Sequence, residues 1–305
     1  PDTRVRCLMR AGSESPVPVG GDQRVSACAG DITRPETLAN AMDGVWGVVN
    51  LAGYREFWAQ RREHFYAINH RGAQNVFRAA LAAGTDKVVQ VSTPLAYGIP
   101  RSLPFDEHSE AGPHPSDYGR SKYLGDQAGW RLHRDAGLPL TIVHLAAVIG
   151  AGDDKATMEV RRAVERRLPA LVGSDTTYTY VYRHDAAEAI VRALLSPTSV
   201  GHSYLIGDQR ATTREYFQMI GDLAAVPIPN TNIPERLLLP AAKVMEWLSR
   251  RTGQRPVIPL DVIRTTAAGS LLFDAGRSKR ELDMQYTPLH TALAESVAEI
   301  QAGQT

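Results

Sequence analysis

The chain has 305 residues and a nearly balanced charge, with 34 basic and 33 acidic residues and a formal net charge of +1. This balance gives no indication of binding to nucleic acid or to an anionic membrane surface. Hydrophobic residues make up 43 % of the chain, which is ample for a sizeable core. No apolar run approaches the roughly 18 residues of a membrane span, and no signal peptide opens the sequence. Cys7 and Cys28 lie in short apolar stretches, which predicts reduced thiols and a cytoplasmic protein.

The sequence opens on a predicted buried strand, residues 5–9, that is followed by Arg10. A dinucleotide-binding fold normally begins one unit earlier, with a strand, a glycine-rich loop and a helix, because the glycines let backbone N–H groups approach a pyrophosphate. That unit does not precede residue 5. Either N-terminal residues have been lost, or the chain does not hold a dinucleotide in the usual way.

Strands and helices then alternate up to about residue 150. The predicted strands cover 25–29, 45–51, 87–92 and 140–148, and the predicted helices cover 36–42, 61–83 and 116–132. The almost wholly apolar strands are typical of parallel strands that are buried on both faces. The alternation predicts an α/β fold, a Rossmann-type doubly wound parallel sheet. Ligands of such a sheet bind beyond the carboxyl ends of the strands, where Thr93 falls.

The helix that begins near Ser116 and stops at Gly137 carries Tyr118 and Lys122, four residues apart and therefore on one face. A phenol has an unperturbed pKa of about 10, and a neighbouring ammonium favours the phenolate. We therefore expect Lys122 to pull the pKa of Tyr118 toward the neutral range. Such a pair would donate and accept protons in carbonyl and alcohol chemistry.

Beyond residue 150 the alternation loosens. Helices are predicted at 155–167, 186–195, 213–224, 237–251, 277–282 and 289–300, and strands at 178–182, 203–206 and 272–274. Helix 237–251 is amphipathic, and we favour packing against the core over a position on a membrane. We predict an NAD(P)-binding Rossmann domain over 1–150, N-terminally incomplete, to which 178–200 return. Most of 151–305 would form a smaller, interleaved substrate-binding lobe.

Six short motifs follow one another along the chain. They are Gly30-Asp31-Ile32, Asn50-Leu51-Ala52-Gly53, Ser-Thr-Pro-Leu-Ala-Tyr-Gly at 92–98, Tyr118-x-x-x-Lys122, Val-Ile-Gly-Ala-Gly-Asp at 148–153 and Tyr-Arg-His-Asp-Ala-Ala at 182–187. Their order and spacing resemble the extended short-chain dehydrogenase/reductase family over essentially the whole chain. That family includes sugar epimerases and dehydratases, dihydroflavonol-reductase-like enzymes and 3β-hydroxysteroid dehydrogenases. Each motif is weak alone, whereas six in register are specific.

The resemblance implies a catalytic set of Thr93, Tyr118 and Lys122. Thr93, in place of the more frequent serine, would hydrogen-bond the reacting oxygen, Tyr118 would be the general acid in reduction and the base in oxidation, and Lys122 would hold the nicotinamide ribose. Further cofactor contacts are implied for Asp31, Ile32, Leu51, Ala52, Gly53 and Asn69. Structural roles are the alternatives for three residues: an N-cap for Asp31, a helix-packing hydrogen bond for Asn69 and a strand-end cap for Thr93.

Arg10 bears on the choice of cofactor. An acidic residue at the end of this strand would bind the ribose 2′-hydroxyl of NAD, whereas an arginine accommodates the 2′-phosphate of NADP. No carboxylate follows Arg10 before Glu14. The alternative is an ordinary surface arginine. We therefore predict NADP, with NAD as the second choice.

The run 144–151 lacks the asparagine that nucleotide-sugar enzymes of the resembled family usually carry before their Tyr-Gly-Pro element, which argues against a sugar nucleotide. The expected pocket residues favour an apolar or aromatic carbonyl compound, although aromatic side chains also fill cores. These residues are Tyr54, Phe57, Trp58, Pro94, Leu95, Tyr97 and Ala147.

We therefore predict an NAD(P)-dependent oxidoreductase that transfers hydride between a nicotinamide cofactor and a carbonyl or alcohol substrate. One alternative is a nucleotide-sugar epimerase or dehydratase with the same catalytic set. The other is a non-catalytic nucleotide-binding regulatory protein, suggested by the missing glycine loop. The expected partner is a small-molecule substrate, without a metal, nucleic acid or membrane. The resemblance also implies a homodimer formed through the Asn69 and Tyr118 helices.

Overall fold

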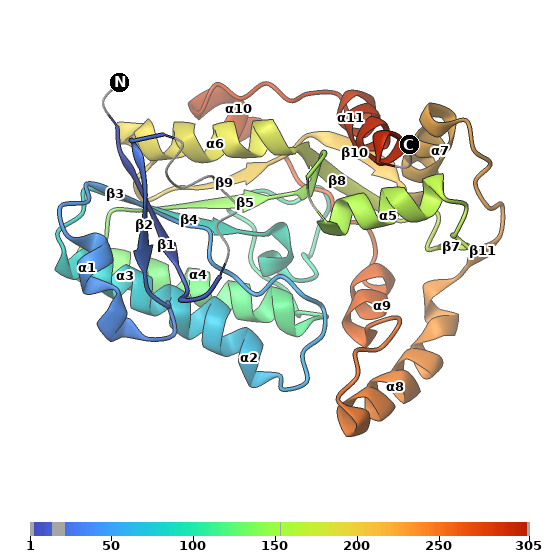
Figure 1. The fold of residues 1–305 in the computed structure, drawn as a ribbon, viewed down its shortest axis with the longest axis horizontal. Coiled ribbons are helices and arrows are strands. Elements are labelled where there is room, and N and C mark those ends of the chain that lie inside the picture. The colour runs from blue at the N-terminus through green and yellow to red at the C-terminus, as the bar shows by residue number, and fades with distance from the viewer. Residues whose placement is uncertain (1–2, 14–21, 153, 304–305) are drawn as a thin grey trace.

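The computed structural model describes residues 3–13, 22–152 and 154–303 of the chain (Figure 1). Its strands are β1 (Val5–Met9), β2 (Val25–Ala29), β3 (Gly47–Asn50), β4 (Lys87–Ser92), β5 (Leu140–Leu145), β6 (Ala147–Ile149), β7 (Leu171–Val172), β8 (Thr177–Tyr182), β9 (Ser203–Ile206), β10 (Gln209–Thr212) and β11 (Asn232–Ile233). Its helices are α1 (Ala39–Met42), α2 (Glu63–Tyr66), α3 (Ala73–Ala82), α4 (Asp117–Ala136), α5 (Asp154–Val164), α6 (Arg183–Leu195), α7 (Thr213–Ala224), α8 (Glu235–Thr252), α9 (Leu260–Ala267), α10 (Gly276–Glu281) and α11 (Leu289–Ala302). A π-helical segment, Ala67–Gly72, joins α2 to α3.

The central parallel sheet has the strand order β3-β4-β5-β9. Its register aligns apolar residues across the strands, for example Val49 with Val89. Helices α3 and α4 pack on one face and α6 packs on the other, as Figure 1 shows. Because both faces are covered, strand side chains such as Val88 and Ile142 are completely buried. The predicted Rossmann-type α/β fold is confirmed.

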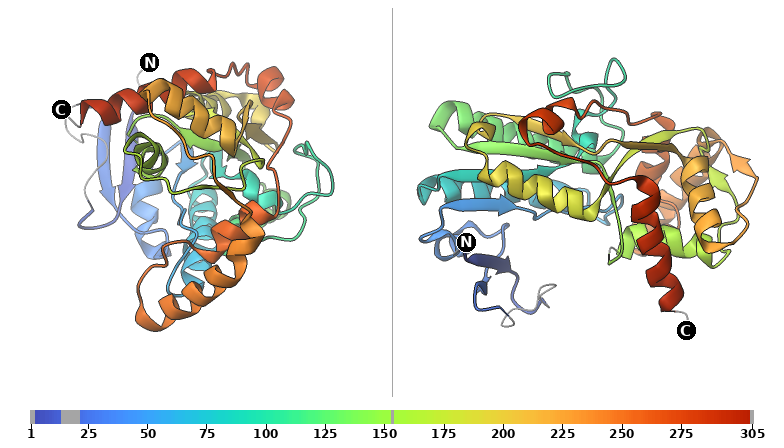
Figure 2. Two further views of the ribbon diagram at one scale, coloured as in Figure 1. Left: turned by 90° about the vertical axis from the view of Figure 1, so that its right-hand side faces the viewer. Right: turned by 90° about the horizontal axis from the view of Figure 1, so that it is seen from above.

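Strands β1 and β2 form a separate parallel pair in which Cys7 is aligned with Ala27 (Figure 2). Within the described residues, no strand pairs with the second edge of β1 or with the edge of β3 that faces away from β4. A doubly wound nucleotide-binding sheet places its glycine-loop strand between the strands that β1 and β3 represent in its order. These strands therefore form two separate parallel sheets, with no strand between β1 and β3 among the described residues.

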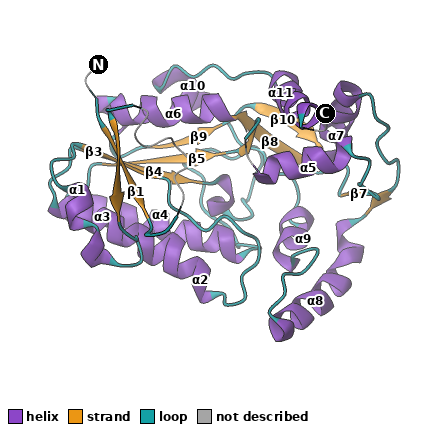
Figure 3. Cartoon of the chain, in the orientation of Figure 1, coloured by secondary structure: helices purple, strands orange, loops and turns teal. Residues whose placement is uncertain are grey.

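The second half of the chain builds a smaller sheet with the order β10-β8-β6, in which β6 is parallel and β10 antiparallel to β8 (Figure 3). Helices α5, α7 and α11 pack against one another beside it, around a second core that includes Tyr216, Ile220 and Leu293. Helices α8 and α9 pack together and project away from both sheets in Figure 1. In the ranges that the structure describes, no helix is both long and apolar enough to cross a bilayer.

Two predicted strands differ from the structure. The predicted strand 140–148 is two strands, because the chain leaves the central sheet after Leu145 and β6 pairs with β8 instead. An uninterrupted apolar run does not reveal such a change of sheet. The predicted strand 272–274 forms only one isolated bridge, between Phe273 and Phe105. The short strands β7, β10 and β11 and the helix α9 are additional to the prediction.

Candidate active site

Helix α4 begins and ends at the predicted residues. The Ser116 hydroxyl accepts a hydrogen bond from the Gly119 N–H at 3.2 Å and caps the first turn. Gly137 closes the helix in the left-handed conformation, with φ 71°. Tyr118 and Lys122 consequently lie one turn apart on the face of α4 that meets the end of β4.

Thr93, which follows β4, lies beside Tyr118. Its hydroxyl is close enough to the Tyr118 phenol to favour the phenolate and lower the pKa of Tyr118, and the Thr93 side chain is buried. Thr93 Oγ1 also accepts a hydrogen bond from the Leu95 N–H at 3.4 Å, so the strand-end cap considered as its alternative role is present as well. The two roles are compatible, because the cap holds the hydroxyl where it reaches the phenol.

Lys122 completes this group. Its Nζ donates a hydrogen bond to the Val91 carbonyl at 2.7 Å, and the side chain is buried. The loop after β3 borders the ammonium, since a Cβ on Gly53 would lie 3.9 Å from Nζ. Thr93, Tyr118 and Lys122, which the sequence analysis groups on resemblance alone, are therefore neighbours in the structure.

The prediction that Lys122 lowers the pKa of Tyr118 toward the neutral range is wrong for this structure. Burial, together with the Asp126 carboxylate, raises the pKa of Tyr118 to about 12 against the opposing Thr93 hydroxyl and Arg55 charge. The Lys122 ammonium is directed to the Val91 carbonyl, and burial lowers the pKa of this lysine, an effect that Asp126 partly offsets. Loss of hydration therefore outweighs the attraction on which the expectation rested. In the cofactor-free protein, Tyr118 is a neutral phenol at neutral pH.

This protonation state can be measured directly. In the cofactor-free protein we expect no phenolate absorbance from Tyr118 between neutral pH and about pH 10, measured as the difference between wild type and Tyr118→Phe, because a raised pKa keeps the proton on the phenol. Thr93→Val, which removes a hydroxyl that lowers the pKa of Tyr118, should not move the titration to lower pH. A phenolate that appears near pH 7 would contradict the structure.

Asn69, in the π-helical segment, fixes the loop after β3. Its Oδ1 accepts a hydrogen bond from the Tyr54 N–H at 2.7 Å, and its Nδ2 donates to the Tyr54 carbonyl at 3.0 Å and to Ser121 Oγ at 2.9 Å. Both amide hydrogens are therefore used within the protein. Asn69 ties the loop to α4, which matches the structural alternative.

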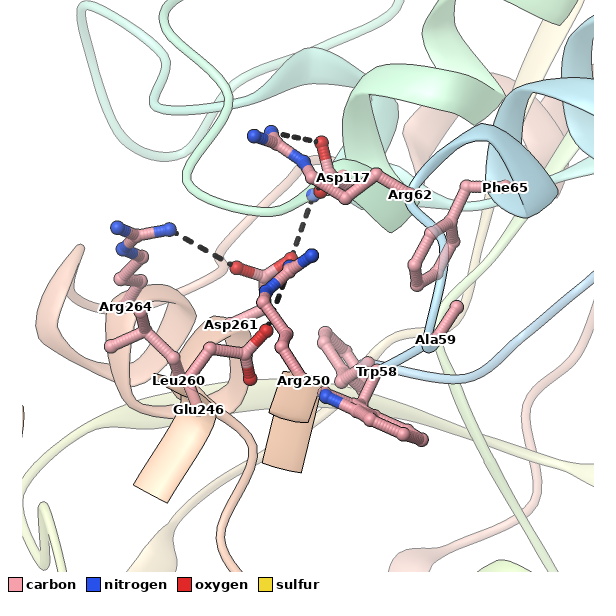
Figure 4. Close-up of a pocket in the computed structure, with 11 residues that line it drawn as sticks. Trp58, Ala59, Arg62, Phe65, Asp117, Glu246, Arg250, Leu260, Asp261 and Arg264 are labelled. Atoms are coloured by element: carbon pink, nitrogen blue, oxygen red, sulfur yellow. Dashed lines mark hydrogen bonds and ion pairs between the residues drawn. The ribbon is translucent and has the colours of Figure 1, made fainter. Parts of the chain in front are cut away.

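A cavity of about 270 Å³ lies where this loop and the start of α4 meet α8 and α9 (Figure 4). Phe57 and Trp58 form part of its wall, and the Phe57 ring meets the Tyr118 ring edge to face, with 5.6 Å between the ring centroids. The cavity also has a charged wall made of Arg62, Asp117, Glu246, Arg250, Asp261 and Arg264. Its lining is therefore mixed, where the sequence analysis expects an apolar pocket.

Two of these charged residues attach α9 to α4. The Asp117 N–H in the first turn of α4 donates a hydrogen bond to Asp261 Oδ2 at 2.9 Å (Figure 4). The Asp117 carboxylate accepts two hydrogen bonds from Arg62, at 2.5 and 2.6 Å. Although burial opposes it, the Arg62 contact holds the pKa of Asp117 below its ordinary value. The turn that carries Tyr118 is thus held by Asp261 of α9 and by Arg62, which directly precedes α2.

Comparison with known proteins identifies the family. The sequence profile of the NAD dependent epimerase/dehydratase family matches residues 2–207, more than half of the chain. The chain belongs to this family. A putative dihydroflavonol 4-reductase from Synechocystis sp. is 25 % identical over 268 residues, which cover 85 % of this chain and 77 % of the relative. Sterol demethylase protein B from Methylococcus capsulatus is 26 % identical over 302 residues, covering 97 % and 90 %. The crystal structure of gox2253 has a TM-score of 0.82 at 27 % identity, covering 98 % of this chain and 91 % of that one.

The residues present fit the two ends of the dinucleotide of an NAD-dependent family. Lys122 borders the exposed Gly53 at one end. At the other end, Arg10 is exposed directly after β1. The pKa of Asp31, which follows β2, is lowered by hydrogen bonds from Thr33 and also by the positive charge of Arg10. Leu51, beyond β3, is 66 % exposed and offers an apolar surface to a ligand. The described residues contain no glycine-rich loop for the pyrophosphate.

Two expected ligand residues have structural roles. Ile32, expected at the adenine, packs its side chain in the core, where a Cβ on Gly72 would lie 2.7 Å from Ile32 Cδ1. Tyr97, expected in the substrate pocket, is also a core residue, and its ring lies 4.9 Å from that of Phe105 and 5.1 Å from that of His144. Both side chains therefore pack in the core, and their expected ligand contacts remain predictions.

The other expected residues are placed less decisively. Asp31 accepts hydrogen bonds from the Thr33 N–H at 2.8 Å and hydroxyl at 2.7 Å, which is a local turn that leaves its second oxygen open to a ligand. The Tyr54 hydroxyl donates to the Trp58 carbonyl at 2.9 Å. The remaining expected residues differ in exposure: Pro94 is buried, Ala52 and Leu95 are partly buried, and Ala147 is exposed.

Behind Lys122 lies a buried polar cluster that the sequence did not predict. Ser92 Oγ donates to Asp126 Oδ2 at 2.5 Å, and His144 Nε2 lies 3.3 Å from the same oxygen. Within the described residues, Asp126 Oδ1 and His144 Nδ1 have no hydrogen-bond partner although both are buried. The spacing of Tyr118, Lys122 and Asp126, each four residues apart, could have indicated Asp126. In the described part of the chain, no group of His, Cys, Asp and Glu side chains could hold a metal ion.

Proposed function

We propose that the protein is an NADP-linked oxidoreductase that interconverts a carbonyl compound and an alcohol. The observation that carries the proposal is the juxtaposition of the Thr93 hydroxyl and the Tyr118 phenol, with Lys122 one turn further along α4. The nicotinamide cofactor would supply or accept the hydride. Lys122 would hold its ribose at the nicotinamide end, and Arg10 with Asp31 would hold the adenosine end.

The side chains of this chain would move the proton. A substrate oxygen beside Tyr118 and Thr93 would accept the phenolic proton of Tyr118 in reduction, while the Thr93 hydroxyl holds that oxygen by a hydrogen bond. Because its pKa is raised to about 12, Tyr118 already carries this proton at neutral pH. The protonation state therefore favours the reductive direction. Phe57, beside the Tyr118 ring, supports an aromatic or apolar carbonyl compound as the substrate.

The test is a titration of this chain with NADPH, followed by an assay of NADPH consumption with aromatic and alicyclic ketones. Saturable binding and substrate-dependent consumption are expected. Binding without consumption of NADPH by any ketone would favour a different reaction of the family. If no binding is detected, the assignment as an oxidoreductase is wrong for this chain, and the non-catalytic regulatory protein becomes the better proposal.

The family description favours a second candidate, a sugar epimerase or dehydratase. Such an enzyme would use the same three residues and return the hydride to its own substrate. It would retain its cofactor through purification and show no net consumption of NAD(P)H. Mass spectrometry of the nucleotide released on denaturation separates the two candidates. The expected homodimer and the cytoplasmic location remain predictions, of which light scattering tests the first.

Substitution of the exposed Arg10 tests the proposed preference for NADP over NAD. Arg10→Ala is expected to weaken NADPH binding by roughly 10- to 100-fold, the effect of losing one charge-assisted hydrogen bond, and to leave NADH binding nearly unchanged. The matched control is Arg24→Ala at the start of β2, where Arg24 is exposed and paired with Asp22 at 2.6 Å. Equal losses for NADPH and NADH, or no loss for either, would contradict the role of Arg10.

A further inference from the structure

The outward side of α8 carries large apolar side chains that are exposed. Leu237, Val244, Trp247 and Leu248 are between 47 % and 71 % exposed. Their spacing places them on one side of the helix, with the exposed Pro240 between Leu237 and Val244. We call this set the outer stripe of α8. From Leu237 to Leu248 it spans about 17 Å at a rise of about 1.5 Å per residue.

The opposite side of α8 already has its partner. Ala242 and Ser249 are buried there, and Ala242 packs with Leu260 and Ile263 of α9. The inner side of α8 therefore accounts for the packing that the sequence predicts for helix 237–251. Among the described residues, nothing covers the outer stripe, and α8 lies at the rim of the molecule, away from both sheets (Figure 1). A flat surface can approach the helix there.

The charges of α8 are segregated between its two sides. Arg236 and Lys243 are exposed and lie seven residues apart, so they flank one edge of the outer stripe. Arg251 lies over the Trp247 ring, 4.1 Å from its centroid. The acidic residue Glu246 is partly buried on the inner side, where it pairs with Arg250 at 2.8 Å. The side that faces solvent thus combines apolar and cationic groups.

We propose that the outer stripe of α8 docks the protein onto the surface of an anionic lipid bilayer. A helix that lies in the interface plane needs an apolar side for the acyl boundary, cations at its edge for the lipid phosphates and a tryptophan at the headgroup level. The outer stripe supplies all three. A bilayer fits better than a protein partner, because its anionic headgroups complement the exposed cations Arg236, Lys243 and Arg251 beside the apolar side chains. This inference does not depend on the proposed reaction.

The test is cosedimentation of the full chain with large vesicles. The wild type is expected to bind equimolar phosphatidylglycerol and phosphatidylcholine, to bind pure phosphatidylcholine less, and to dissociate as salt is raised above about 0.1 M. The triple variant L237S/V244S/L248S should lose about tenfold or more in affinity for the anionic vesicles. R236E/K243E changes only exposed side chains and should abolish the preference for anionic lipid, so it decides the question if the triple variant does not fold.

The control is V191S/L195S on α6, where both side chains are at least half exposed but no part of α8 is changed. It should bind vesicles like the wild type. The proposal is overturned if the wild type does not sediment with anionic vesicles, or if the control loses as much binding as the triple variant. It is also overturned if light scattering shows a dimer that the triple variant dissociates, because a second copy of the chain then covers the stripe.

Discussion

Tyr118→Phe is expected to lower kcat on the order of 10²- to 10⁴-fold in the reduction of a carbonyl substrate, because the phenylalanine has no proton to give to the substrate oxygen. The dissociation constant for NADPH should change little, since the ring remains beside Phe57 and only the hydroxyl is lost. The measurement is steady-state NADPH consumption together with a fluorescence titration of NADPH. Tyr123→Phe, on the same helix and next to Lys122, is the matched control and should keep wild-type turnover.

Two substitutions of Thr93 test the role of its hydroxyl beside Tyr118. Thr93→Ser retains the hydroxyl that meets the phenol and should retain most of the turnover, whereas Thr93→Val removes it at similar volume and should reduce kcat. Loss of turnover in both variants would point to packing at the end of β4 in place of a hydrogen bond. Wild-type turnover in Tyr118→Phe would refute the proposed acid.

Gly125→Val is expected to be among the most destabilising substitutions in the first half of the chain. A Cβ at Gly125 would lie 2.3 Å from the backbone carbonyl oxygen of Asn69, so α4 and the π-helical segment would have to move apart. Asn69 yields little, because its side chain is bonded to Tyr54 and Ser121. Overpacking of this kind costs about 1–3 kcal/mol, and a backbone atom as the obstacle favours the upper end. Urea denaturation measures the change in the free energy of unfolding.

The same displacement should reduce activity in the variant that still folds, because it would move Lys122 and Tyr118 away from the loop after β3. Gly276→Ala in α10 is the control. A Cβ there meets only the flexible ends of the Arg280 and Asp274 side chains, at 2.8 and 3.0 Å. Its effect should stay within about 0.5 kcal/mol. A Gly125→Val protein as stable as the wild type would show that the two helices do not approach as closely as described.

The sequence by itself determined the features that depend on neighbours a few residues away. The apolar runs at β3, β4 and β5 specify strands buried on both faces, and Ser116 and Gly137 set the two ends of α4. The four-residue spacing of Tyr118 and Lys122 then fixes them on one face. These features were predicted correctly because helix caps and periodicity act within one or two turns of the chain.

Only the tertiary structure decided the features that depend on distant partners. Ser92, Asp126 and His144 come from three elements and meet behind Lys122, and Tyr97 turns into the core to pack against the same histidine. The acidity of Tyr118 follows from the burial that such contacts create, which no spacing along the chain reveals. Burial is set by whichever segments happen to cover a side chain, and those segments can lie more than a hundred residues away.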